Sequence, residues 1–348
     1  MNVPRNVWGL LSVAMLLGSG CGGATSNATQ GHSSSVDSEV HFEDEAAPEA
    51  QSGPPATPEV LHAEQLLAAG NGVEAARELR EYLRGHANDT RAHLDLGLAL
   101  ELQNDAQGAM REYRAALSID TTFAEAANNL GALLREEGEL VQAIRTLQEA
   151  VRMRPRFASA RFNLAMALEE HGDTSEALAA YETTIEDAPR AAMPRVNYGL
   201  LLVHLTRNEE AVRAFRAALP LARGDRAALL AIGNGFRRAG EGESAVRAVQ
   251  AAIAAGDDGP TPALLSELAL AQRAANDRPG AEASLAQAIV LDARYATAHY
   301  LLANMLAGRQ AYAEAIEHWR AYLQLEPRGD HAADAREKIR AAESAASR

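Results

Sequence analysis

Residues 124–157 read AEAANNLGALLREEGELVQAIRTLQEAVRMRPRF, and this stretch decides the fold. Apolar and small residues recur at helical spacing on both sides of Gly138. The informative positions are Leu130, Gly131, Leu134, Ala143, Leu147, Ala150 and Pro155. A glycine between two segments of this kind favours a turn, so the stretch predicts two amphipathic helices joined as helix–turn–helix.

The same pattern recurs along most of the chain. Alanine returns in steps of 34 residues, with one step of 36, at Ala75, Ala109, Ala143, Ala177, Ala211, Ala245, Ala281 and Ala315. Twelve residues earlier stands a small residue: Ala63, Gly97, Gly131, Ala165, Gly199, Gly233, Ala269 and Ala303. Four residues later stands a large one: Leu79, Tyr113, Leu147, Tyr181, Phe215, Val249, Leu285 and Trp319. A fourth column follows: Leu83, Leu117, Val151, Ile185, Leu219, Ile253, Ile289 and Leu323. Four columns in phase indicate an internal repeat.

The repeat resembles the tetratricopeptide repeat, a helix–turn–helix unit of 34 residues. The resemblance implies an all-α solenoid of eight units in residues 59–329, with units that begin at residues 56, 90, 124, 158, 192, 226, 262 and 296. Residues 330–348 are charged and are expected to form a capping helix, with Ile339 as its main apolar residue. The first unit is degenerate, and the terminal proline of the family remains only as Pro155, Pro189 and Pro327.

The columns have a physical explanation. Small residues let two helix axes approach closely, and large residues four positions apart fill the seam between units. Left-handed backbone is expected at the turns, at Gly70, Gly138, Gly172, Gly240, Asn104 and Asn276. Pro220 should shorten or bend the helix in which it falls. The two extra residues within 256–260 predict a local change of superhelical pitch, or alternatively only a long loop.

Charge excludes one class of partner. Lys and Arg number 33 against 47 Asp and Glu, a formal net charge of −14, so nucleic acid, which needs a cationic surface, is a poor partner. Residues 22–58 hold six acidic residues and no Lys or Arg. Their low apolar content predicts a disordered acidic linker. A single cysteine excludes an internal disulfide and a cysteine-based zinc site.

The N-terminus predicts an anchor. Val7–Leu17 is an apolar run of 11 residues, too short to span a bilayer but typical of a signal peptide. The small residues 18–20 precede Cys21, which resembles the lipobox of bacterial lipoproteins. The resemblance implies a signal peptide over residues 1–21 and fatty acyl chains, palmitate among them, on Cys21. Gly22 then favours the outer membrane, facing the periplasm. The alternative is an ordinary secretory signal with an incidental cysteine.

Binding is expected on the inward face of the first helices. In three consecutive units the sixth position is Asn129, Asn163 and Asn197, and such a ladder holds extended peptides in some relatives. An apolar strip lies beside it: Phe162, Met166, Val196, Leu200 and Leu230. Arg135, Arg237 and Arg238 are candidate partners for carboxylates. Asparagine is also common at this position without a ligand, and part of the strip could belong to the core.

Catalytic chemistry is not expected. The sequence holds no phosphate-binding loop, dinucleotide fingerprint, zinc-protease motif or serine-hydrolase motif, and no cofactor, metal or small-molecule substrate is predicted. Glu314 and His318, four residues apart, are interpreted as a solvated helix pair. The leading hypothesis is a non-enzymatic envelope lipoprotein that scaffolds a protein complex, similar in plan to lipoproteins that assemble type IV pilus secretins or gather cell-wall enzymes. The alternative is a periplasmic peptide-binding chaperone that uses the asparagine ladder.

Overall fold

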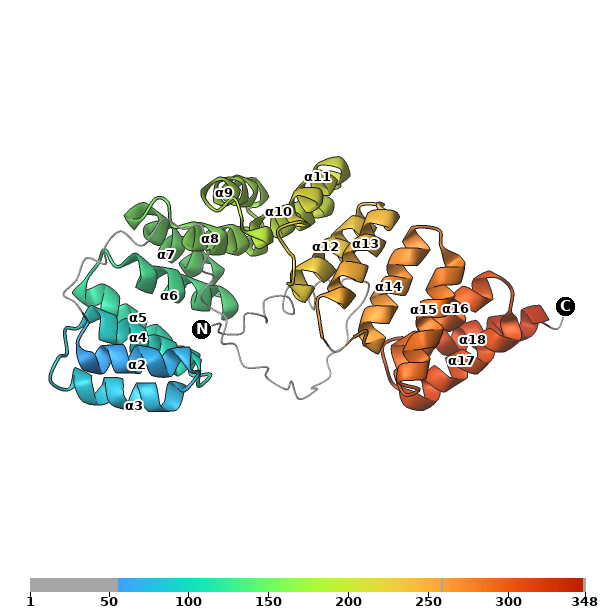
Figure 1. The fold of residues 1–348 in the computed structure, drawn as a ribbon, viewed down its shortest axis with the longest axis horizontal. Helices are drawn as coiled ribbons and strands as arrows, with labels where there is room; N and C mark the ends of the chain where they lie inside the picture. Colours follow the sequence, from blue (N-terminus) through green and yellow to red (C-terminus); the bar gives the residue numbers. More distant parts are fainter. Residues whose placement is uncertain (1–55, 258, 347–348) are drawn as a thin grey trace. The chain divides into compact units, whose positions relative to one another are not determined.

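The computed structural model describes residues 56–257 and 259–346, and Figure 1 shows their helices in chain order. These residues divide into two compact units, 56–201 and 202–346, and the division falls within α10. The first unit contains α2 (Pro58–Ala68), α3 (Gly72–Leu83), α4 (Thr90–Glu101), α5 (Ala106–Ile119), α6 (Ala124–Glu136), α7 (Leu140–Met153), α8 (Ala158–His171), α9 (Thr174–Asp187) and most of α10 (Ala192–His204). The second contains α11 (Asn208–Ala218), α12 (Arg226–Arg238), α13 (Gly242–Ala254), α14 (Pro262–Ala274), α15 (Arg278–Leu291), α16 (Ala296–Gly308), α17 (Tyr312–Leu325) and α18 (Ala332–Ala346).

The predicted all-α fold is confirmed: the described residues form seventeen helices and no strand. In the first unit each helix from α2 to α8 packs against the next one in sequence, and α6 also contacts α8. In the second unit the same holds from α11 to α17, and α12 also contacts α14. The first helices of neighbouring pairs therefore touch each other, as in a solenoid of stacked repeats.

The sequence columns are the core. All eight column alanines are fully buried, and the large residues four positions later are at most 2% exposed. The fourth column is half-buried in every pair. Small and large residues meet within a pair: a Cβ added to Gly131 would lie 2.5 Å from Leu147 Cγ, and one added to Gly233 would lie 2.8 Å from Val249 Cγ2. At Gly97 the obstructing atoms are those of the Tyr113 ring.

The eight turns within pairs share one backbone conformation. The predicted turn residues are confirmed, with positive φ at all four glycines and at Asn104 and Asn276. The two remaining pairs place Thr206 (φ 59°) and Gln310 (φ 67°) at the equivalent position. The fold thus imposes left-handed backbone even where the residue resists it, which strains the β-branched Thr206 most.

Two places depart from the regular repeat, at Pro220 and in the connection after Ala254. Helix α11 ends at Ala218 after 11 residues, whereas α7 and α9 each have 14, so Pro220 shortens its helix as predicted. Beyond Ala254, the longer connection leaves α13 and α14 in contact. The predicted change of superhelical pitch stays a prediction.

The capping helix α18 packs against α17. Its buried residues are Ala332, Ala335 and Ala342, while Ile339 is half-buried against the core, so alanines contribute more to the docking than predicted. Polar contacts reinforce it: the Tyr300 hydroxyl donates to Asp334 Oδ2 at 2.7 Å, and Lys338 Nζ donates to Asn304 Oδ1 at 3.0 Å.

Two predicted segments, the signal peptide with Cys21 and nearly all of the acidic linker, lie outside the described residues. Within the described residues, no helix combines the length and apolar character that a membrane span requires.

We expect Gly97→Ala to lower the free energy of unfolding by about 1–2 kcal/mol, because its methyl group would overlap the Tyr113 ring and overpacking outweighs the gain in helix propensity. The control is Gly308→Ala in α16, where an added Cβ meets nothing within 4 Å. It should stabilise by about 0.5–1 kcal/mol. Urea unfolding measures both, and a stabilising Gly97→Ala would refute the close packing.

Thr206→Gly should raise the free energy of unfolding by about 1 kcal/mol, because glycine removes the steric cost of left-handed backbone. Gly240→Ala, at the equivalent turn with φ 87°, should lower it by a similar amount. Thermal melts of the two variants therefore shift in opposite directions. A destabilised Thr206→Gly variant would show that the Thr206 side chain contributes more than its backbone costs.

Candidate protein-binding surface

The asparagine positions on the first helices form a hydrogen-bonded cluster. Asn163 on α8 donates from Nδ2 to Oδ1 of Asn128 on α6 at 2.8 Å. Asn128 in turn donates to Oδ1 of Asn129 at 2.9 Å. The contact arises because α6 packs against α8, which brings the sixth position of one pair beside the fifth position of the preceding pair. Asn128 was missed from the sequence, although its place directly before Asn129 was the available signal.

The exposure expected for the ladder is not found. Asn129 and Asn163 are each 1% exposed, and Asn197 is 8% exposed. Two of the three carboxamides are thus joined through Asn128 instead of standing free. Asn197 differs, because its buried Oδ1 accepts no hydrogen bond in the described structure. Peptide binding by this ladder stays a prediction.

The apolar strip divides between core and surface. Phe162 and Val196 are buried, and the Phe162 ring lies 5.9 Å from that of Tyr181, so these two residues belong to the core. This outcome matches the alternative that part of the strip is structural. Met166, Leu200 and Leu230 are half-buried and retain accessible apolar surface.

A buried tyrosine–carboxylate pair lies in the first unit. The Tyr181 hydroxyl on α9 donates to Glu169 Oε2 on α8 at 2.7 Å. Burial raises the pKa of Glu169, while the hydrogen bond from Tyr181 opposes that rise. Burial also raises the pKa of Tyr181 well above its ordinary value, helped by the nearby Glu169 charge. Tyr113 and Glu101 form the same bond two pairs earlier, so this contact is a recurring feature of the repeat.

The candidate arginines differ in accessibility. Arg135 donates from Nη1 to Glu170 Oε1 at 2.7 Å, and its side chain is 19% exposed. Arg135, which was expected to bind a carboxylate of a ligand, is therefore paired with the carboxylate of Glu170 in the same protein. In the second unit Arg237 donates to Asn234 Oδ1 at 3.0 Å, and burial lowers the Arg237 pKa despite the nearby Glu267. Burial raises the pKa of Glu267 itself. Arg238 is exposed and remains accessible to a partner.

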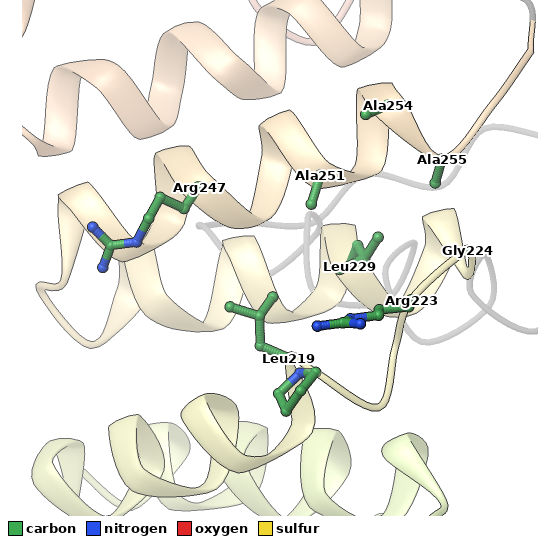
Figure 2. Close-up of a pocket in the computed structure, with 9 residues that line it drawn as sticks. Leu219, Arg223, Gly224, Leu229, Arg247, Ala251, Ala254 and Ala255 are labelled. Atoms are coloured by element: carbon green, nitrogen blue, oxygen red, sulfur yellow. The ribbon is translucent and has the colours of Figure 1, made fainter.

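The second unit also contains a pocket of about 470 Å³. It opens between the α11–α12 connection and α13, and Figure 2 shows its lining. The lining residues are Leu219, Pro220, Arg223, Gly224, Leu229, Arg247, Ala251, Ala254 and Ala255. The pocket lies where Pro220 shortens α11. Sequence analysis predicted this shortened helix but not the cavity beside it.

Metal-ligating side chains do not cluster in the described residues: no group of three His, Cys, Asp or Glu could hold an ion there. Among the described residues, Glu314 and His318 form no ion pair with each other. Glu314 instead pairs with Arg309 at 3.5 Å, and His318 Nδ1 lies 2.9 Å from His299 Nδ1. Burial and the neighbouring His299 lower the pKa of His318.

Comparison with known proteins decides the family. The sequence profile of the tetratricopeptide repeat matches residues 60–122, 128–192, 162–228 and 266–330, which together exceed half of the chain. The chain belongs to the tetratricopeptide-repeat family. Repeats of this family form scaffolds for protein–protein interaction, so this general role extends to the chain.

Three solved structures are similar to this chain. The hetero-tetramer Cut9–Hcn1 of the APC/C is 17% identical with a TM-score of 0.50, and the match covers 81% of this chain and 56% of that chain. MamA is 26% identical with a TM-score of 0.43, over 46% of this chain and 93% of its own. YrrB, described as having an unusual peptide-binding site, is 19% identical with a TM-score of 0.43, over 58% and 99%. No curated protein sequence matches the chain.

Tyr181→Phe should destabilise the protein by about 1.5–3 kcal/mol at pH 7, because the buried Glu169 carboxylate loses its donor. Burial raises the Glu169 pKa above 4.5 in the folded protein, so the unaltered protein loses stability as pH rises through that raised pKa. Below it Glu169 is protonated, and Tyr181→Phe then removes a hydrogen bond between two neutral groups. The penalty should therefore fall to about 1 kcal/mol at pH 4, where a neutral pair is lost. Urea unfolding at both pH values measures the difference.

Glu169→Gln is the matched control, because it removes the titrating group and keeps an acceptor for Tyr181. In that background the penalty for Tyr181→Phe should be the same at both pH values. A pH-independent penalty in the unaltered chain would show that the carboxylate does not depend on the tyrosine.

Proposed function

We propose that the protein is a lipid-anchored scaffold that holds other envelope proteins together. Its repeat array provides the binding surface, and acyl chains on Cys21 hold it to a membrane. The proposed location is the outer membrane, with the array in the periplasm. No catalytic step forms part of this function.

One observation carries the scaffold role: helix pairs of a protein-binding repeat occupy the chain from Pro58 to Leu325. Stacking leaves an inner face on the first helices of the repeats. That face presents half-buried apolar residues, such as Met166 and Leu200, and in the second unit the exposed Arg238. Mixed apolar and cationic surface of this kind suits docking of folded or extended protein segments.

The anchor rests on the N-terminal sequence. An apolar run, three small residues and the only cysteine follow one another within residues 7–21. Each buried methylene contributes about 0.8 kcal/mol, so two or more acyl chains would hold the protein firmly to a bilayer. The acidic residues 22–58 would then separate the array from the membrane by roughly 30–35 Å if they behave as a random coil.

The peptide-binding chaperone ranks second. Its ladder requires free carboxamides, whereas Asn163 and Asn128 donate to other asparagine side chains. A bound peptide would have to displace these hydrogen bonds. The scaffold function does not need that exchange, because it uses surface that is already accessible.

The test is Cys21→Ser in the native cell, combined with crosslinking and mass spectrometry. We expect the unaltered protein to pellet with outer-membrane fractions and Cys21→Ser to become soluble, because serine cannot carry the thioether-linked lipid. Ser26→Ala, five residues away, is the control and should remain with the membrane. Continued pelleting of Cys21→Ser would refute the anchor.

Crosslinking of the unaltered protein tests the scaffold. We expect the same few envelope proteins to be joined to more than one repeat, since a scaffold holds several partners at once. The soluble Cys21→Ser protein should still capture them in solution. Crosslinks confined to short unfolded peptides would instead favour the chaperone.

A further inference from the structure

We propose that the pocket beside Pro220 is the docking site for an acidic peptide segment of a partner protein, one that carries a large apolar side chain next to its carboxylates. The proposal rests on the scaffold function and names the chemistry of one partner. It concerns the second unit alone, and all nine lining residues lie within residues 219–255.

The pocket exists because a proline interrupts a repeat. The second helices α5, α7 and α9 each have 14 residues, whereas α11 ends after 11 at Ala218. The chain then turns through Gly224, which has φ 82°, before α12 begins at Arg226. Beyond Ala218 the chain makes an irregular turn, in which the Ala222 N–H donates to the Ala218 carbonyl at 3.1 Å, and the pocket lies between this turn, α12 and α13. A cavity of about 470 Å³ is large enough for a bulky side chain together with the backbone that bears it.

The walls of the pocket are apolar. Six of its lining residues are leucine, proline or alanine. Leu219 and Leu229 have large side chains, while the small side chains of Ala251, Ala254 and Ala255 leave room on the α13 side of the pocket. Figure 2 shows Leu219 on the connection that follows α11 and Leu229 on α12. Burial of an aromatic or large aliphatic side chain there would contribute hydrophobic free energy.

Two arginines give the pocket its charge. Arg223 and Arg247 are both exposed, and neither forms an ion pair with a carboxylate of the described residues. Arg247 donates only to the Ser244 hydroxyl, at 2.9 Å. Figure 2 shows the Arg223 guanidinium between Leu219 and Leu229 in this view, while Arg247 lies farther along α13 and its guanidinium extends away from Ala251. Guanidinium groups with spare donors bind carboxylates through paired hydrogen bonds.

The surroundings strengthen the preference for acidic ligands. Residues 219–255, which contain the whole lining, hold five arginines and three acidic residues, Asp225, Glu241 and Glu243, in a chain whose net charge is −14. The pocket is therefore a local cationic site on an acidic protein. An acidic segment would be repelled by most of the chain and attracted here, which favours a defined place of docking.

Fluorescence polarisation with the full chain tests the proposal. The probe is a labelled peptide with the sequence of residues 38–46, SEVHFEDEA, which places phenylalanine beside three consecutive carboxylates. Two further probes replace the phenylalanine by serine or the three acids by their amides. We expect the first probe to bind and each altered probe to bind at least about tenfold more weakly. Equal binding of all three would overturn the proposal.

Protein variants locate the binding. Arg223→Glu combined with Arg247→Glu should weaken binding at least about tenfold by reversing the charge. Ala251→Leu should weaken it by filling the pocket with both arginines kept. Arg294→Glu, an exposed arginine between α15 and α16, is the control and should change affinity less than about twofold. Circular dichroism confirms that each variant is folded. Unchanged affinity in the first two variants would overturn the assignment.

One outcome identifies a different occupant. If the probe binds only after Phe42→Ser in the full chain, the chain's own residues 38–46 fill the pocket, and the partner assignment is wrong. Failure of the peptide to bind both the unaltered chain and the Phe42→Ser variant, with partners still crosslinked to the array in native membranes, would refute the pocket and leave the scaffold function standing. If the peptide binds the pocket but no partner is crosslinked to the array in native membranes, the scaffold function is refuted.

Discussion

The fold depends on one close contact that is repeated along the chain. A residue without a large side chain on the first helix of a pair lies against a large residue on the second helix, as Gly131 does against Leu147. No other residue type fits at such glycines without moving its neighbour. The short distance between helix axes lets the column alanines become fully buried. Each pair then has a regular shape, and regular pairs can stack.

Stacking also decides what the inner face can do. When α6 and α8 come together, polar side chains that a single pair would expose to water find partners in the next pair. Asn163 meets Asn128, and Arg135 meets Glu170. Buried polar groups are costly unless they are hydrogen-bonded, so the array satisfies many of them internally. Binding surface remains where such partners are lacking, at half-buried apolar residues and at unpaired arginines.

Departures from the repeat are therefore informative. At Thr206 and Gln310 the fold overrides local preference and keeps left-handed backbone. At Pro220 the opposite happens, because a proline cannot occupy the interior of a helix, and α11 stops early. The strained turns preserve the stacking, whereas the shortened helix opens a cavity.

The sequence by itself determined the helical class, the period of the repeat, the core columns and six of the eight turn residues, because local periodicity and glycine or asparagine turns encode all of these within about 34 residues. The candidate site was less predictable. Position within a repeat suggested that Asn129, Asn163 and Arg135 are exposed on the inward face of the first helices, but contacts between different repeats bury or pair them. Only the tertiary structure decided which polar groups are satisfied internally and that a cavity lies beside Pro220, because both depend on side chains that are distant in sequence and meet only when the repeats stack.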